Sequence, residues 1–278
     1  MLILSSLNQK IVTFIRPYRE KLWLIANLAA RQFLQRYRGS FLGVLWPFLA
    51  AAIQMSIYAF IFSVILRARW QQAGISGPRE DLPFWLVMFA GMTIYFFCSE
   101  IIAAAPGMVT SVPNYVKKIK FPLAVLPIVQ LLVSLTTACV FLLILTASIA
   151  VAGNFHWHIL LAPLVFMQAA FWCLGFSWMM AAAGVFVRDL QQLVPFMLQI
   201  MLFLTPIFYP ASAVPERFRV IVQLNPLAFL VETFRNLALW GIFPSWKIFG
   251  AWTAASVLFA YAGLLIFQRL RSAFADVL

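Results

Sequence analysis

The sequence predicts an all-α, polytopic membrane protein with six transmembrane helices, and two observations carry this prediction. Hydrophobic residues make up 64% of the 278 residues and charged residues only 10%, whereas about a quarter of the residues in a typical soluble domain are charged. The apolar residues also gather in long runs, and a helix of about 20 residues crosses the hydrocarbon core of a bilayer. A water-soluble fold of this length could not cover so much apolar surface.

Six apolar runs supply the predicted spans. They cover residues 41–66, 84–105, 123–151, 159–187, 193–209 and 248–267. Five of them are long enough to cross the membrane, and the run at 193–209 is marginal. We expect residues 1–278 to form one transmembrane domain. The short apolar piece before Lys10 is too brief for the core of a cleavable signal peptide.

The formal net charge of +12 is best explained as a topology signal. With the N-terminus in the cytoplasm, most Lys and Arg residues fall in cytoplasmic segments, as the positive-inside rule describes. The acids Glu80, Asp81, Glu216 and Glu232 then fall outside. Six spans return the C-terminus to the cytoplasm, so we expect both termini inside. We expect no binding to nucleic acid.

Residues 21–38 precede the first span and have the pattern of an amphipathic helix. Leu22 and Phe33 fall on one face, and Arg31 and Arg38 fall on the opposite face. A helix that is basic on one side and apolar on the other suits the cytoplasmic membrane interface. An ordinary basic flank of the first span is the alternative.

Residues 211–240 follow the fifth run and are too polar to cross lipid. Pro215 and Pro226 divide this segment, which predicts two short re-entrant helices over residues 215–224 and 226–239. Backbone that enters the membrane part-way is tolerated where it is buried in protein or lines water, so the segment is a candidate outer gate. The residues assigned to the gate are Pro206, Tyr209, Asn225, Pro226, Glu232 and Arg235, and the last two are spaced to pair on one helix.

Known catalytic motifs are missing from the sequence. No Gly-x-x-x-x-Gly-Lys-Ser/Thr phosphate loop occurs, and neither does a Gly-x-Ser-x-Gly elbow or a His-Glu-x-x-His zinc motif. Cys98, Cys139 and Cys173 lie inside apolar runs, and His156 and His158 have no acid or cysteine beside them. We therefore expect no catalytic residue, no metal site and no cofactor in this chain.

Glu100, in the second run, is the acid whose depth needs an explanation. A carboxylate inside a membrane span is costly and is usually functional or paired. A position near the interface or in a water-filled vestibule is the alternative. Proton-coupled carriers usually hold several such groups, so a single acid does not favour a proton relay.

Aromatic residues recur at helical spacing in two of the runs. Trp46, Tyr58 and Phe62 lie on one side of the first run, and Phe196, Gln199 and Phe203 share a side of the fifth. Aromatic faces stack on the apolar faces of sugar rings, which lets a glycan slide without fixed hydrogen bonds. These six residues are candidates for the lining of a translocation channel, and ordinary helix packing is the alternative.

Five segments together resemble the permeases of ABC transporters that export polysaccharides. They are Arg36-Tyr37-Arg38-Gly39-Ser40 with the following residues to Pro47, Tyr115-Val116-Lys117-Lys118-Ile119-Lys120-Phe121-Pro122, Phe186-Val187-Arg188-Asp189-Leu190, Leu204-Thr205-Pro206-Ile207-Phe208-Tyr209 and Leu224-Asn225-Pro226-Leu227. Their order and spacing match that family over nearly the whole chain. The sequence is most similar to exporters of O-antigen and teichoic acid.

The resemblance implies a transport subunit of a bacterial inner membrane, not an enzyme. It implies a homodimer with two copies of a separate ATPase, which would bind ATP and magnesium. The cargo would be a lipid-linked polysaccharide on undecaprenyl diphosphate, passing through a channel between two protomers among membrane lipids. The short helices after the fifth span would close the outer mouth of that channel.

The resemblance also assigns roles at the cytoplasmic face. Residues 106–122 would form a coupling loop that contacts the ATPase, with Val112, Asn114, Tyr115, Lys117 and Lys118 as its candidate residues. Arg188 and Asp189 form the tight cytoplasmic turn. Arg31, Arg36 and Arg38 are placed to attract the lipid diphosphate, because guanidinium groups match phosphate oxygens; a topology signal is the alternative.

Two other functions stay open at this point. One is an ABC permease for drugs or other small molecules, which differs from a polysaccharide exporter in channel width and in its dependence on a sugar polymer. The other is an ATP-independent carrier or a lipid-modifying membrane enzyme. A co-purifying ATPase would exclude the second of these.

Overall fold

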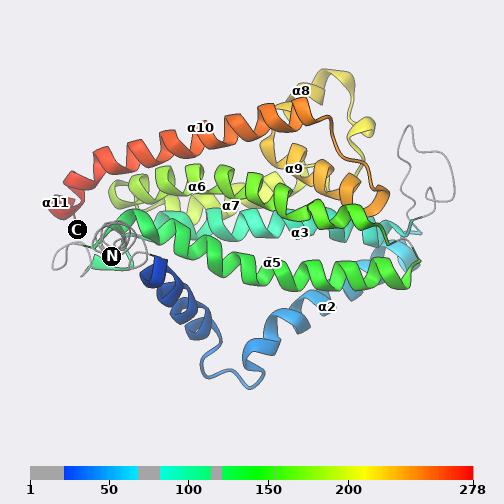
Figure 1. Ribbon diagram of the computed structural model, residues 1–278, viewed down its shortest axis with the longest axis horizontal. Helices are drawn as coiled ribbons and strands as arrows, with labels where there is room; N and C mark the ends of the chain where they lie inside the picture. The colour runs from blue at the N-terminus through cyan, green and yellow to red at the C-terminus, as the bar shows by residue number, and fades with distance from the viewer. Residues whose placement is uncertain (1–21, 68–81, 114–120, 154, 278) are drawn as a thin grey trace, which may run out of the picture.

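The computed structural model describes residues 22–67, 82–113, 121–153 and 155–277. Within these ranges the chain is a bundle of long helices that run along one axis (Figure 1). The four longest are α3 (Phe84–Ala104), α5 (Leu126–Val151), α6 (Ala162–Phe186) and α10 (Trp246–Leu270). The prediction of an all-α, polytopic membrane protein is confirmed.

Five helical stretches are long and apolar enough to cross a membrane. They are Gly43–Ile65, Phe84–Gly107, Leu123–Val151, Trp157–Phe186 and Trp246–Ala273. A sixth helix, α7 (Leu190–Leu204), is apolar but shorter. Its 15 residues give a length of about 22 Å, against about 30 Å for the hydrocarbon core. The described residues therefore contain five or six spans, where the sequence predicted six.

The α7 helix differs from the predicted fifth run, residues 193–209, at both ends. It begins at Leu190, before the apolar run, because the polar residues Gln191 and Gln192 are already helical. It ends at Leu204, and Thr205 is extended with φ −86° and ψ 137°. Pro206 explains this end, since a proline disfavours the helical conformation of the residue before it.

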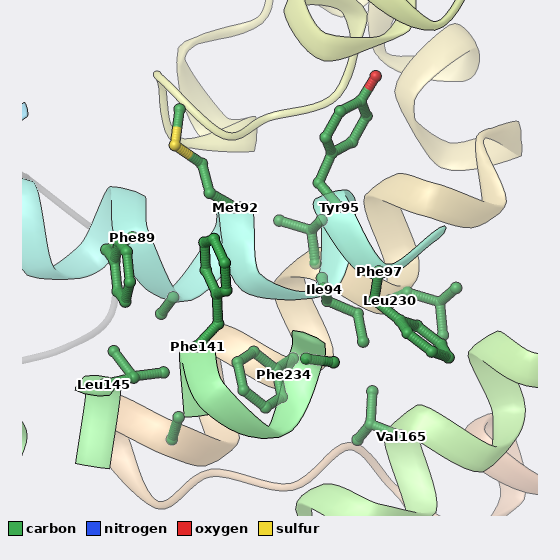
Figure 2. Packing of buried hydrophobic residues seen from close by; sticks show 14 of the residues in the cluster. Phe89, Met92, Ile94, Tyr95, Phe97, Phe141, Leu145, Val165, Leu230 and Phe234 are labelled. Atoms are coloured by element: carbon green, nitrogen blue, oxygen red, sulfur yellow. The ribbon is translucent and has the colours of Figure 1, made fainter. Parts of the chain in front are cut away.

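The centre of the bundle is α3. In the most apolar part of this stretch 78% of the residues are buried, against 6% in the first stretch. A helix that is apolar on all sides belongs inside a bundle. Figure 2 shows Phe89 and Phe97 of α3 beside side chains of α5, α6 and α9. The rings of Phe89 and Phe141 lie 5.7 Å apart and nearly parallel.

Two glycines bring α6 and α10 into close contact. A Cβ atom added to Gly263 would lie 2.3 Å from the backbone oxygen of Gly175, and one added to Gly175 would lie 2.8 Å from the oxygen of Phe259. Small residues allow membrane helices to pack backbone against backbone. The α6–α10 pair is therefore a fixed part of the bundle.

The first span lies at the edge of the bundle. It consists of the 3-10 turn η1 (Gly43–Leu45), α2 (Trp46–Ala59) and the π-helix η2 (Phe60–Ile65). Figure 1 shows the N-terminal end of α2 diverging from the bundle, next to the helix over residues 22–37. Most of the α2 surface consequently has no partner among the described residues.

A helical hairpin packs against the bundle in the part of the molecule away from α11 (Figure 1). It consists of α8 (Glu216–Leu224), α9 (Pro226–Arg235) and the π-helix η7 (Asn236–Trp240), close to the bounds predicted for two short helices. No residue of α8 is buried, whereas most of α9 packs inside the bundle. Figure 1 shows this hairpin distant from the end where residue 22 and α11 (Phe274–Val277) lie, called here the α11 end.

Candidate functional site

The α8–α9 hairpin is fixed to the segment that follows α7. The Asn225 side chain caps α9 by accepting a hydrogen bond from the backbone N–H of Leu227 at 2.9 Å. The same side chain donates from Nδ2 to Thr205 Oγ1 at 3.1 Å. Pro226 occupies the first turn of α9, where its missing N–H costs nothing. Asn225 therefore positions the hairpin and the end of α7 relative to each other.

Arg235 makes a second connection to the same segment. Its side chain is buried, with 2% exposed, and Nη2 donates to the backbone oxygens of Pro206 at 2.8 Å and Ile207 at 3.3 Å. A Cβ atom added to Gly91 of α3 would lie 2.7 Å from Nη2. The absence of a side chain at Gly91 thus makes room for the guanidinium.

Most of the predicted gate residues are brought together by these contacts. Pro206 is buried against Arg235, and Tyr209 donates a hydrogen bond from its hydroxyl to the backbone oxygen of Phe203 at 2.9 Å. Glu232 is partly buried one turn before Arg235, and the predicted pairing of these two residues stays a prediction. Gly91 was not identified from the sequence, because nothing in a local pattern shows that a distant arginine lies over it.

A row of stacked rings joins η2, the last part of the first span, to the end of α7. Phe62 stacks on Phe84 with centroids 4.9 Å apart and on Phe208 at 6.4 Å, and Phe208 stacks on Phe203 at 5.5 Å. Phe62 lies in the π-helix η2, and both Phe62 and Tyr58 pack against the buried core.

Trp46 and Tyr58 remain on a common side of α2. They line an open pocket of about 400 Å³ together with Ile53, Gln54 and Ile57. Gln54 Nε2 donates to the Tyr58 hydroxyl at 3.2 Å. The pocket offers two aromatic rings and one amide to whatever occupies the exposed side of α2.

The three candidate residues of α7 lie on one exposed face. Phe196 and Phe203 are 57% and 67% exposed, and Gln199 is exposed between them. The opposite face packs through Val194 and Leu198. The faces of α2 and α7 are connected through Phe208, so the structure brings the two predicted groups together at that end.

At the α11 end, Arg36 contacts Glu100. The Arg36 guanidinium forms an ion pair and a hydrogen bond with this carboxylate of α3. Burial opposes the charge of Arg36, but attraction to Glu100 outweighs it and raises the pKa of Arg36 above its usual value. Glu100 is thus paired, as a carboxylate at that depth usually is. Arg31 and Arg38 are exposed, as Arg36 is, and Arg36 differs from them in its ion pair with Glu100.

The loop after α3 packs on the turn between α6 and α7. A Cβ atom added to Gly184 would lie 2.1 Å from the backbone oxygen of Pro106, and Gln191 Nε2 donates to Thr110 Oγ1 at 3.1 Å. Arg188 and Asp189 are exposed in that turn, and Val112 is half-buried in the loop. The structure thus joins the predicted coupling loop to the predicted turn. Asn114, Tyr115, Lys117 and Lys118 lie outside the described residues.

The described ranges hold no group of three or more His, Cys, Asp or Glu side chains that could bind a metal ion. Cys98 and Cys173 are buried as free thiols, and the His158 ring stacks on Trp157 at 4.1 Å.

Known proteins resemble this chain over almost its full length. It is 28% identical over 272 residues to the O-antigen export system permease protein RfbA of Myxococcus xanthus, covering 95% of this chain and 99% of that protein. It is 26% identical over 265 residues to a protein of the same name from Klebsiella pneumoniae, covering 92% and 95%. A profile of the ABC-2 type transporter family matches residues 24–239. The chain therefore belongs to the ABC-2 type transporter family, as the five sequence segments predicted.

Proposed function

We propose that this chain is the permease subunit of an ATP-driven exporter that moves a lipid-linked, O-antigen-like polysaccharide across the bacterial inner membrane. Similarity to two O-antigen export permeases over more than nine-tenths of the chain supports this cargo. The observation that carries the proposal is the pair of exposed, aromatic-bearing faces on α2 and α7. Within the described ranges of one chain both faces lack a partner, and a second protomer would enclose a path between them.

The proposed topology has six spans and both termini in the cytoplasm. The α7 helix is short, and the extended segment after Leu204 completes its crossing together with the α8–α9 hairpin. The α11 end is then cytoplasmic, which agrees with the basic residues of the helix over residues 22–37. The hairpin lies toward the outer face, where it forms the gate predicted from the sequence.

In this proposal two protomers form the channel, and Trp46, Tyr58, Phe196, Gln199 and Phe203 line it. Phe62 belongs to the stacked rings at its outer end. Flat aromatic faces bind sugar rings without fixed hydrogen bonds, so successive sugars can pass. Arg31 and Arg38 attract the carrier diphosphate near the first helix. Arg36 contributes through the guanidinium nitrogens that do not bond to Glu100.

Two copies of a separate ATPase bind ATP and magnesium, and their hydrolysis of ATP drives transport. Their movement acts on residues 106–122, including Val112, Asn114, Tyr115, Lys117 and Lys118, and on the turn at Arg188 and Asp189. Because Gln191 bonds to Thr110, a displacement of the loop reaches the base of α7 directly. That helix carries three of the five residues proposed to line the channel.

A deletion strain tests the cargo. Cells that lack this subunit should lose the glycan from their surface and accumulate it, linked to its lipid, on the cytoplasmic side, and the restored gene should reverse both changes. An unchanged surface glycan, with increased sensitivity to small toxic compounds, would instead support a drug permease.

A further inference from the structure

A cavity of about 340 Å³ lies at the α11 end, between the helix over residues 22–37, the loop after α3 and the start of α5. Its volume falls within the roughly 300–1,000 Å³ of sites that bind small ligands. It is separate from the exposed faces of α2 and α7 that we assign to the channel. We call it the headgroup pocket.

The headgroup pocket is lined by both polar and apolar side chains, called here its polar wall and its apolar wall. Arg31, Gln32, Gln35, Ser111 and Gln130 supply polar atoms, while leucine, methionine and valine side chains line the remainder. Polar and apolar surfaces side by side suit an amphiphile, whose head and chain need different surroundings. A purely aqueous ligand would leave the apolar wall uncovered.

The pocket carries a positive charge. Arg31 lines it, and no acidic side chain occurs among the described residues of its wall. Arg36 is paired with Glu100, whereas Arg31 has no ion pair or hydrogen bond with any residue in the described ranges. A guanidinium in this state binds a phosphate strongly, because its fork of N–H groups matches phosphate oxygens.

The polar wall is also preformed. Gln32 Nε2 donates to Gln130 Oε1 at 2.6 Å, and Gln130 Nε2 donates to Ser134 Oγ at 3.1 Å. Gln130 is only 3% exposed, so this network holds the first helix at a fixed distance from α5. Arg31 precedes Gln32 directly, so the same contact positions its backbone beside the pocket.

We propose that the headgroup pocket binds the phosphate headgroup of a membrane lipid, with Arg31 as its phosphate ligand and the apolar wall against the start of the lipid chain. Basic pockets between helices at the cytoplasmic side of a membrane are suited to such headgroups. The bound lipid stabilises the first helix against Val112 and Ser111 of the loop after α3. This inference rests on the proposed function for the cytoplasmic position of the pocket and for the carrier as one of its two candidate lipids. Two lipids offer the same chemistry, a bilayer phospholipid and an isoprenoid diphosphate carrier.

The test is equilibrium binding to the full-length subunit, purified with its ATPase partner and depleted of lipid. The probes are dioctanoyl phosphatidylglycerol, farnesyl diphosphate and, as the uncharged comparison, dioctanoylglycerol. Arg31→Gln should weaken binding of the phosphate probes by about ten- to a hundredfold, the value of a lost charge-assisted contact. The matched control is Arg217→Gln, an exposed arginine of α8 outside the pocket, which should change affinity less than twofold.

Either phosphate probe supports the site if its binding requires Arg31, and the tighter of the two identifies the natural lipid. Equal weakening in Arg31→Gln and Arg217→Gln would overturn the proposal, and so would equal binding of dioctanoylglycerol. A third outcome is that both phosphate probes bind the isolated subunit but not the assembled complex. In that case the ATPase covers the pocket, and the lipid proposal is overturned. Leu126→Trp, at the start of α5 in the pocket lining, should block the cavity and abolish binding while the complex still assembles.

Discussion

Arg235 Nη2 donates a hydrogen bond to the backbone oxygen of Pro206 across 2.8 Å, which joins α9 to the segment where α7 ends. The two residues are distant in sequence, and α3 lies directly beneath the contact at Gly91. One side chain thus connects a hairpin, a helix end and the central helix of the bundle. A movement of the hairpin must either carry the end of α7 with it or break this bond.

Replacement of Arg235 by Met should destabilise the protein. The backbone oxygens of Pro206 and Ile207 would lose their donor inside the bundle, and a buried acceptor without a partner costs about 1–3 kcal/mol. Thermal unfolding in detergent should show a lower midpoint. The matched control is Arg217→Met on exposed α8, and equal midpoints for the two variants would contradict the structural role of Arg235.

Gly263→Ala should separate α6 from α10. The new Cβ atom would lie 2.3 Å from the backbone oxygen of Gly175, which cannot turn away as a side chain could. Overpacking of this kind costs typically 1–3 kcal/mol. Gly250→Ala, at a position of α10 with no atom within 4 Å, should leave the unfolding temperature unchanged or slightly raised, since alanine favours helix over glycine.

Glu100→Gln should loosen the helix over residues 22–37. The pair with Arg36 is only partly buried, so the cost should be modest, about 1 kcal/mol. Limited proteolysis should cut this helix faster in Glu100→Gln and in Arg36→Gln. The reversed pair, Arg36→Glu with Glu100→Arg, should restore part of the protection; if it protects no better than the single variants, the ion pair does not hold the helix.

Trp46→Ala combined with Phe203→Ala should reduce glycan export several-fold and leave assembly with the ATPase intact. Both side chains are exposed in the single chain, so their loss removes contacts with the cargo and leaves the buried core in place. Surface glycan and co-purified ATPase are the two measurements. Leu258→Ala, an exposed position of α10 that is 69% accessible, is the control. Export at the control's rate would refute the aromatic channel.

Charge reversal at Lys117 and Lys118 should uncouple ATP hydrolysis from export. These residues belong to the predicted coupling loop, so their loss should leave ATPase activity that no longer drives transport. Both rates should be measured in reconstituted vesicles. Full export in the double variant would show that these lysines have no role in coupling and act only as a topology signal.

The helices were largely predictable because apolar run length reports membrane spans directly. The prolines also placed the hairpin, since Pro215 and Pro226 stand at the starts of α8 and α9. The ends of α7 were less predictable. Its first turn holds Gln191 and Gln192, which a search for apolar runs excludes, and its last turn is set by Thr205 and Pro206.

Contacts between distant segments were not predictable. The sequence showed Arg36 and Glu100 separately, but not that they pair across 64 positions. Likewise Gly175 and Gly263 are ordinary helix residues until their backbones meet. Phe62 gives a third example, because it stacks on Phe84 and Phe208, which are distant from it in the sequence.

The central claim is that this chain works as the permease of an ABC exporter with a separate ATPase. Affinity purification of the tagged subunit in mild detergent, followed by mass spectrometry of the bound proteins, tests it most directly. We expect a stoichiometric ATPase in the purified complex. Its reproducible absence would contradict the account and would favour an ATP-independent carrier or a membrane enzyme with Glu100 at its site.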